Sequence, residues 1–156
     1  MSRVLAIYFA EQANATMSPL QTAALEAGKG IVGDRYYSAK GSFSEKLAGL
    51  PDIELTLIES EEVERFNKAF GFSFSCADFR RNIVTQGAKL NDLVGKEFFV
   101  DKVKLKGIRL CEPCANLAKV LVPDVMIGLR GKAGLRAAIL NSASLSVGDE
   151  IGENAL

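Results

Sequence analysis

The sharpest chemical feature of the sequence is a pair of cysteines, Cys111 and Cys114, separated by Glu112 and Pro113. An apolar run typical of a strand precedes the pair, and a run typical of a short helix follows it. Backbone N–H groups and the dipole at a helix start favour the thiolate, which is both a nucleophile and a soft-metal ligand. The pair is therefore a candidate redox dithiol or metal ligand. Burial as two small apolar side chains is the alternative without chemistry.

A second candidate is the segment Phe-Arg-Arg-Asn-Ile-Val at residues 79–84. If a strand starts here, Arg80 and Asn82 lie on one face and Arg81 on the other, because side chains alternate along a strand. The guanidinium fork suits phosphate and carboxylate groups. The segment thus predicts an anion site, and surface arginines in weak ion pairs are the alternative.

Several classes of site are excluded by composition. The chain has no histidine, which rules out Ser-His-Asp and Cys-His catalysis and any histidine metal site. Three cysteines are too few for a four-thiolate zinc or iron–sulfur site within one chain. The 19 basic residues equal the 19 acidic ones and form no basic helix, so nucleic acid is not an expected partner.

A glycine pattern between Gly28 and Gly33 has the spacing of the dinucleotide-binding fingerprint. That fingerprint functions only between a strand and a helix N-terminus. Residues 23–27 have little β-propensity, and residues 34–37 are typical of a turn. We therefore interpret these glycines as permitting tight turns, and we expect no nucleotide site.

The elements that would position these residues are mostly strands. One clear helix is expected from Ser60, as N-cap, to a stop at Gly71, and a shorter one from Cys114 to Leu121, before Pro123. The close spacing of the strands after residue 80 predicts antiparallel meanders. Strands are predicted at residues 3–10, 53–58, 81–85, 97–100, 103–110, 135–140 and around 145. The expected fold is mostly β: a β-barrel-like, mainly antiparallel sheet with a few short peripheral helices, in one domain over residues 1–156.

The location predicted for this chain is cytoplasmic. Its apolar N-terminal run is too short for a signal peptide, and no stretch reaches the roughly 18–20 apolar residues of a membrane span. An odd number of cysteines is typical of thiols kept reduced.

Six short motifs occur in order along the chain: Gly-Ile-Val-Gly-Asp-Arg-Tyr at 30–36, Leu-Thr-Leu-Ile-Glu at 55–59, the segment at 79–84, Leu-Val-Gly at 93–95, Cys-Glu-Pro-Cys at 111–114 and Val-Gly-Asp-Glu at 147–150. Together they resemble the MOSC domain, the C-terminal domain of molybdenum cofactor sulfurases. The resemblance covers most of the sequence and implies a fold centred on a β-barrel.

The resemblance also implies roles for residues. In molybdenum reductases that carry this domain, the arginine and asparagine of the Phe-Arg-x-Asn-Ile-Val strand lie at the cofactor site, and a cysteine binds the metal. The matching positions are Arg80, Asn82 and Cys114. Arg35 and Arg81 are further candidates for binding an anionic group of the cofactor, and Cys111 is the second candidate thiol.

The function implied is binding of molybdenum cofactor or transfer of sulfur to it. One alternative is a small molybdenum-dependent reductase of N-hydroxylated compounds, served by a redox partner protein. Another is a non-catalytic interaction module. Larger relatives have an additional N-terminal barrel domain, and the sulfurases have a pyridoxal-phosphate desulfurase domain. This sequence shows neither, so pyridoxal phosphate is not expected on this chain, and sulfur would come from a partner such as a cysteine desulfurase.

Overall fold

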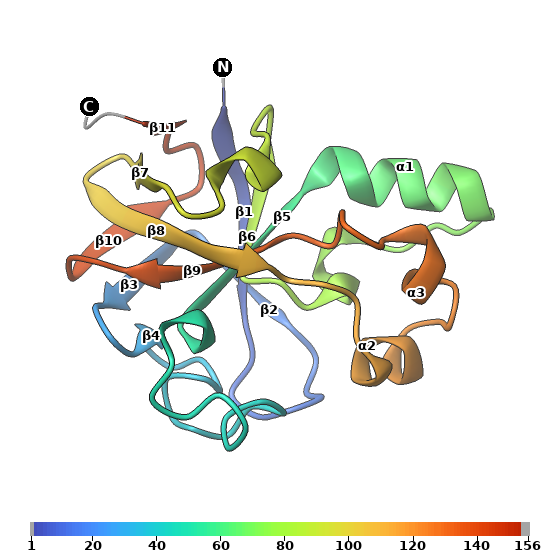
Figure 1. Cartoon of the computed structure of the whole chain (residues 1–156), viewed down its shortest axis with the longest axis horizontal. Coiled ribbons are helices and arrows are strands. Elements are labelled where there is room, and N and C mark those ends of the chain that lie inside the picture. Colours follow the sequence, from blue (N-terminus) through green and yellow to red (C-terminus); the bar gives the residue numbers. More distant parts are fainter. Residues whose placement is uncertain (1, 154–156) are drawn as a thin grey trace.

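A curled sheet of eight strands forms a half-barrel at the centre of the computed structural model, which describes residues 2–153 (Figure 1). A three-stranded sheet lies beside it. In spatial order the large sheet contains β11 (Ile151–Gly152), β7 (Glu97–Val100), β8 (Val103–Leu110), β9 (Leu135–Ile139), β5 (Leu55–Glu59), β6 (Ile83–Gln86), β1 (Arg3–Phe9) and β2 (Ser18–Leu20), and the small one contains β10 (Ala143–Ser146), β3 (Thr22–Glu26) and β4 (Gly30–Ile31). The expected mostly β, barrel-like fold is confirmed.

One strand pair departs from the antiparallel pattern. Strands β5 and β6 are parallel, and helix α1 (Ser60–Phe70) connects them as a crossover. The predicted meander over residues 81–110 is therefore wrong for its first strand, because β6 pairs with β1 and β5 rather than with β7. Strands β7, β8 and β9 do form an antiparallel meander. All other pairings between these strands are antiparallel.

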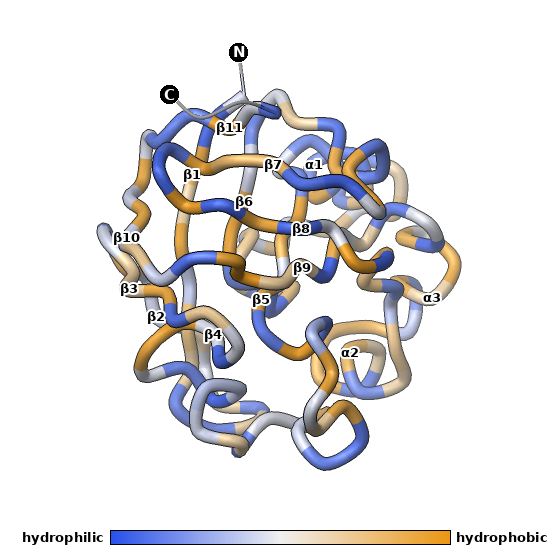
Figure 2. Tube along the Cα trace, turned by 60° about the vertical axis from the view of Figure 1, so that its left-hand side comes forward, coloured by the Kyte–Doolittle hydropathy of each residue, from blue (hydrophilic) through white to orange (hydrophobic). Residues whose placement is uncertain are grey.

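The apolar core has two parts, one on each face of the large sheet. Successive side chains of β5 point to opposite faces of the sheet and so contribute to both parts. Leu57 belongs to the cluster inside the half-barrel, and Ile58 belongs to the cluster under the helices. Phe66 of α1 and Phe79 anchor the second cluster, with their rings 5.9 Å apart in an edge-to-face arrangement. The helices lie on the side opposite the three-stranded sheet (Figures 1 and 2).

Helix α1 ends as the sequence predicts and starts one residue earlier than expected. Gly71 takes a left-handed conformation with φ of 76°, and its N–H bonds to the Asn67 carbonyl. The N-cap is Glu59, so Ser60 is the first helical residue and not the N-cap. The extended backbone of Glu59 continues strand β5 directly into the helix, which leaves no separate loop for a serine cap.

The remaining helices are short and lie after β8. Cys114 is the N-cap of α2 (Ala115–Val120), and α3 (Val125–Gly128) follows Pro123 without having been predicted. None of the helices within residues 2–153 has the length and hydropathy needed to cross a bilayer. Three short 3₁₀-helices complete the structure: η1 (Pro51–Ile53), η2 (Cys76–Phe79) and η3 (Leu90–Leu93).

The glycine-rich segment is a turn between strands. Gly28 and Gly33 have φ values of 81° and 91°, which favour glycine over residues with a Cβ. The low β-propensity read from residues 23–27 is misleading, because Thr22–Glu26 is strand β3 and pairs with β10. Residues 32–49 form turns and bends with no helix. The helix N-terminus required for a dinucleotide is therefore missing from this segment.

Candidate functional site

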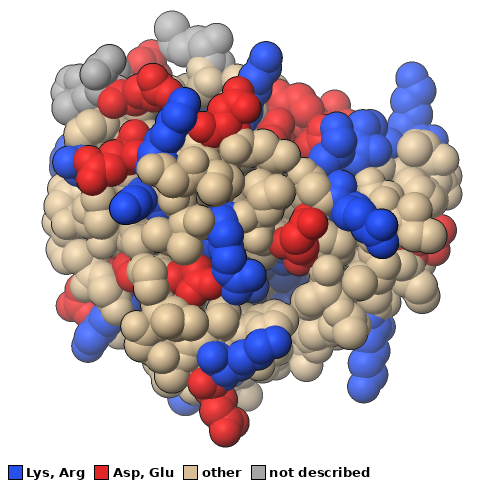
Figure 3. Space-filling model, viewed as in Figure 1, with Lys and Arg blue, Asp and Glu red and all other residues tan. Residues whose placement is uncertain are grey.

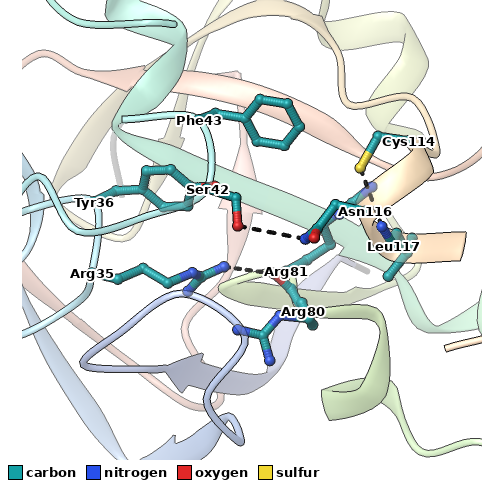
Figure 4. A pocket seen from close by; sticks show the side chains of 9 residues that line it. All are labelled: Arg35, Tyr36, Ser42, Phe43, Arg80, Arg81, Cys114, Asn116 and Leu117. Carbon is teal, nitrogen blue, oxygen red and sulfur yellow. Dashed lines mark hydrogen bonds between the residues drawn. The ribbon is translucent and has the colours of Figure 1, made fainter. Parts of the chain in front are cut away.

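A pocket opens where the loop of residues 34–50 meets the start of α2 and the segment before β6 (Figure 4). About 330 Å³ of it is unfilled by atoms, including the part open to solvent. On the face of the molecule shown in Figure 3, Lys and Arg side chains and an acidic side chain lie at the edge of a hollow. The pocket is lined by Arg35, Tyr36, Ser42, Phe43, Arg80, Arg81, Cys114, Asn116 and Leu117.

Arg81 forms part of the pocket wall and is only 7% exposed. Its guanidinium donates to three backbone carbonyls: Nε to Ala133 at 2.9 Å, Nη1 to Phe79 at 3.3 Å and Nη2 to Cys111 at 3.1 Å. No acidic side chain within residues 2–153 forms an ion pair with it. Carbonyl dipoles orient this buried charge but do not neutralise it.

Arg80 is held beside it in an unusual backbone conformation. With φ of 63°, it ends the 3₁₀-helix η2 in the left-handed region. Its Nη1 donates to the carbonyl of Ala15, while Nη2 is buried without a hydrogen-bond partner among residues 2–153. Burial and the charge of Arg35 lower the pKa of Arg80. An anion bound beside this guanidinium would reduce the repulsion between Arg80 and Arg35.

Arg35 is better compensated than its neighbours. Its Nη1 lies 3.1 Å from Oδ1 of the buried Asp34, and its guanidinium lies 4.8 Å from the centroid of the Tyr36 ring. Nη2 donates to the Arg80 carbonyl at 3.4 Å. Arg35 therefore fixes the backbone of Arg80 and has less charge available for a ligand.

Asn82 does not line the pocket. It is 2% exposed, and its Oδ1 accepts hydrogen bonds from the backbone N–H and the hydroxyl of Thr56, both at 3.3 Å. Its Nδ2 donates to the Tyr8 carbonyl at 3.1 Å. The expectation that Arg80 and Asn82 share a strand face is wrong, because β6 begins only at Ile83. The two arginines line the pocket together, and Asn82 joins β1 to β5 beneath them.

The two cysteines occupy different environments. Cys114 is half-buried and lines the pocket, and its Sγ accepts a hydrogen bond from the Leu117 N–H at 3.4 Å (Figure 4). Cys111 is 2% exposed and lies outside the pocket lining. The structure thus brings Cys114 together with Arg35, Arg80 and Arg81, and separates it from Cys111 and Asn82.

Some lining residues were not found from the sequence. Asn116 joins the walls of the pocket, because its Nδ2 lies 3.2 Å from Asn14 Oδ1 and 3.5 Å from Ser42 Oγ. Tyr36 and Phe43 add aromatic surface from the loop. This loop has no hydrophobic periodicity, and the only signal near it is the Gly-Asp-Arg-Tyr motif.

A metal at this site would have a single protein ligand. Within residues 2–153 no group of three or more cysteine, aspartate or glutamate side chains is arranged to hold a metal ion. The thiol of Cys114 is the one soft donor in the pocket lining. A metal held here would have to arrive with its other ligands, as part of a cofactor.

The fold and the pocket together define a class: a half-barrel protein whose pocket combines a thiol with arginines, two of which, Arg80 and Arg81, have no acidic partner within residues 2–153. A sequence model of the MOSC domain matches residues 44–152, and the chain belongs to the MOSC domain family. Such domains are associated with molybdenum cofactor. A search of curated proteins gives no significant match.

Solved structures show the same fold at low sequence identity. The YuaD protein from Bacillus subtilis has a TM-score of 0.79 at 16% identity, with 97% of this chain and 94% of that chain covered. YiiM from Geobacillus stearothermophilus has a TM-score of 0.75 at 15% identity, with 97% and 74% covered. YiiM from Escherichia coli has a TM-score of 0.72 at 16% identity, with 100% and 71% covered.

Proposed function

We propose that this chain binds molybdenum cofactor in the pocket, with Cys114 as the metal ligand or as a carrier of sulfur for the cofactor. One observation carries the proposal: Arg80, whose Nη2 is buried with no hydrogen-bond partner among residues 2–153, lines the same pocket as Cys114. The neighbouring Arg81 is buried with no acidic partner within residues 2–153. A ligand that is anionic at one end and carries a soft metal at the other complements this pocket.

The residues fit the two ends of the cofactor separately. Arg80 and Arg81 would bind its terminal phosphate, where each charge-assisted hydrogen bond contributes about 1.5–3 kcal/mol. Asn82 would act by positioning them, since its own amide holds β1 and β5. When bound, the cofactor supplies a metal centre able to exchange electrons and accept a thiolate. The contribution of Cys114 is a thiol already oriented by the Leu117 N–H.

If the chain carries sulfur, the sulfur is bound by Cys114, the more accessible of the two thiols. The Cys114 thiolate would attack the outer sulfur of a persulfide on a partner cysteine desulfurase. The S–S bond of the donor breaks, the donor cysteine leaves as a thiolate, and Cys114 becomes the persulfide, with no net oxidation. Cys111 is 2% exposed and could not meet a donor without local opening.

The test is elemental analysis of the protein purified from cells that make the cofactor, together with a persulfide assay. Stoichiometric molybdenum supports cofactor binding, and persulfide without molybdenum supports the carrier role alone. Absence of both contradicts the proposal and favours an interaction module. Reduction of an N-hydroxylated substrate with a redox partner protein would establish the reductase alternative.

Replacing Arg80 by alanine is expected to lower the molybdenum content roughly tenfold or more, because one charge-assisted hydrogen bond is worth at least that factor. Arg80→Lys should restore only part of it, since a point charge cannot form a bidentate fork. Arg65→Ala on α1 is the matched control, because it also removes a guanidinium that donates to a backbone carbonyl. Wild-type molybdenum content in Arg80→Ala would refute the assignment of Arg80.

A further inference from the structure

A second pocket adjoins the first and shares Phe43 and Cys114 with it. The Cys114 thiol therefore borders two pockets. The second pocket has about 480 Å³ unfilled by atoms, including the part open to solvent. Its cationic lining residues are Lys46, Arg109 and Arg136. The proposed function uses none of these three side chains.

Arg109 and Arg136 are directly opposite each other on the neighbouring strands β8 and β9. Like charges in such a pair are destabilising unless something compensates them. Asp52 compensates the first, because its Oδ2 lies 2.6 Å from Arg109 Nε. No carboxylate within residues 2–153 forms an ion pair with Arg136.

Arg136 is 9% exposed and makes few polar contacts. Its Nη1 donates to the Asp52 carbonyl at a long 3.4 Å, and its guanidinium lies 5.4 Å from the centroid of the Phe43 ring. Most of its N–H donors are left for the pocket that it lines. A buried guanidinium held over an aromatic ring can bind one planar oxyanion with its free N–H groups.

The other charged groups around this pocket do not neutralise Arg136. Glu112 is the acidic residue in the lining, and its Oε1 accepts the Gly131 N–H at 2.7 Å. Lys46 is exposed and adds positive charge. Leu47 and Pro113 are both buried and supply apolar walls. Apolar walls with a convergent guanidinium suit a small organic carboxylate better than inorganic phosphate.

We propose that this second pocket binds the carboxylate of a small organic molecule, with Arg136 as the recognition residue and the rest of the molecule against Cys114. That this molecule is the substrate of the cofactor site rests on the proposed function. Binding of the carboxylate does not depend on the proposed function, because it needs only side chains of this chain and no cofactor.

The test compares two alkylating reagents on the cofactor-free protein. Iodoacetate carries a carboxylate, and iodoacetamide is its neutral isostere, so the ratio of their rates at Cys114 measures carboxylate recognition. Labelling is mapped by mass spectrometry, and N-acetylcysteine gives the ratio for an unassisted thiol. We expect a higher ratio in the protein, and a roughly tenfold fall in Arg136→Gln, the factor for one charge-assisted hydrogen bond. The iodoacetamide rate should not change.

Two control variants show which pocket causes the preference for iodoacetate. Arg65→Gln removes a distant guanidinium and should leave the ratio unchanged, which excludes a net-charge effect. Arg80→Gln removes a cation of the first pocket. The proposal is overturned if Arg80→Gln lowers the ratio while Arg136→Gln does not, or if the wild-type ratio equals that of N-acetylcysteine.

A second measurement needs no variant. Sodium benzoate should protect wild-type Cys114 from iodoacetamide at concentrations where inorganic phosphate does not. Equal protection by both anions, or none by benzoate, contradicts a carboxylate site. These results can be told apart from those that test the proposed function. Normal molybdenum content with no carboxylate preference refutes only carboxylate binding in the second pocket. A carboxylate preference in a protein that never contains molybdenum refutes only cofactor binding.

Discussion

Replacing Cys114 by serine is expected to remove molybdenum and transferable sulfur from the purified protein, while Cys111→Ser is expected to keep both. Cys114 lines the pocket with the arginines, and Cys111 does not. Serine is a favourable N-cap, so Cys114→Ser should preserve the start of α2 and remove only the soft donor. We expect at least a tenfold loss of molybdenum and persulfide, measured by elemental analysis and a persulfide assay.

The paired variant is an informative control because it changes the same atom type three residues away. Cys111→Ser places a hydroxyl in a buried position and should lower stability without emptying the pocket. Limiting iodoacetamide applied to cofactor-free protein from pH 5 to pH 9 should label Cys114 before Cys111, in line with their exposure. If Cys111→Ser lost the metal and Cys114→Ser retained it, the two roles would be exchanged.

Replacing Arg81 by alanine should reduce the free energy of unfolding by at least about 1–3 kcal/mol, the cost of leaving one buried carbonyl without a donor. The substitution removes the donor to the carbonyls of Phe79, Cys111 and Ala133, all in a region where water has little access. Urea denaturation monitored by circular dichroism measures the change. The free energy of unfolding of Arg81→Lys should fall between those of the wild type and Arg81→Ala, because an ammonium group has no planar fork that could donate to three carbonyls.

Arg80→Ala is the comparison for this experiment. The Arg80 side chain makes one hydrogen bond to a backbone carbonyl, and its Nη2 has no partner among residues 2–153. Removing this side chain should therefore lower the free energy of unfolding much less than removing that of Arg81. A similar loss in both variants, or no loss in Arg81→Ala, would show that the carbonyl contacts of Arg81 do not stabilise the fold. The contrast would also make Arg80 the cleaner residue for ligand-binding experiments.

Local patterns were sufficient to predict many of the elements. The strands at 97–100 and 103–110 have the predicted bounds, because alternation and a tight turn are encoded within a few residues. The strand-to-helix change around residue 114 also placed Cys114 correctly at a helix start. In contrast, the β5–α1–β6 crossover depends on pairing between distant segments, and the apolar pattern of β6 does not specify its neighbours.

The pocket was predictable only in part. Arg80 and Arg81 were identified from residue type, but their relative orientation was not, because Arg80 adopts a left-handed φ that is uncommon for a non-glycine residue. Asn82 was assigned to the ligand, and its amide instead bonds to the neighbouring strands. Arg136 looks like an isolated charge in an apolar strand, and only the folded chain shows that it is buried beside a second pocket.

The contacts of Arg81 have a consequence for how the protein can vary. The chain leaves the half-barrel at Cys111 and returns at Ala133, and Arg81 bonds to both carbonyls. One side chain thus clamps the base of an excursion that carries α2 and α3. Cys114 stands close to this clamp, whereas Ile127, 79% exposed, lies far along the excursion. The residue type can therefore change at an exposed position such as Ile127, while the buried Val125 and Leu129 keep α3 in the core and the thiol keeps its place.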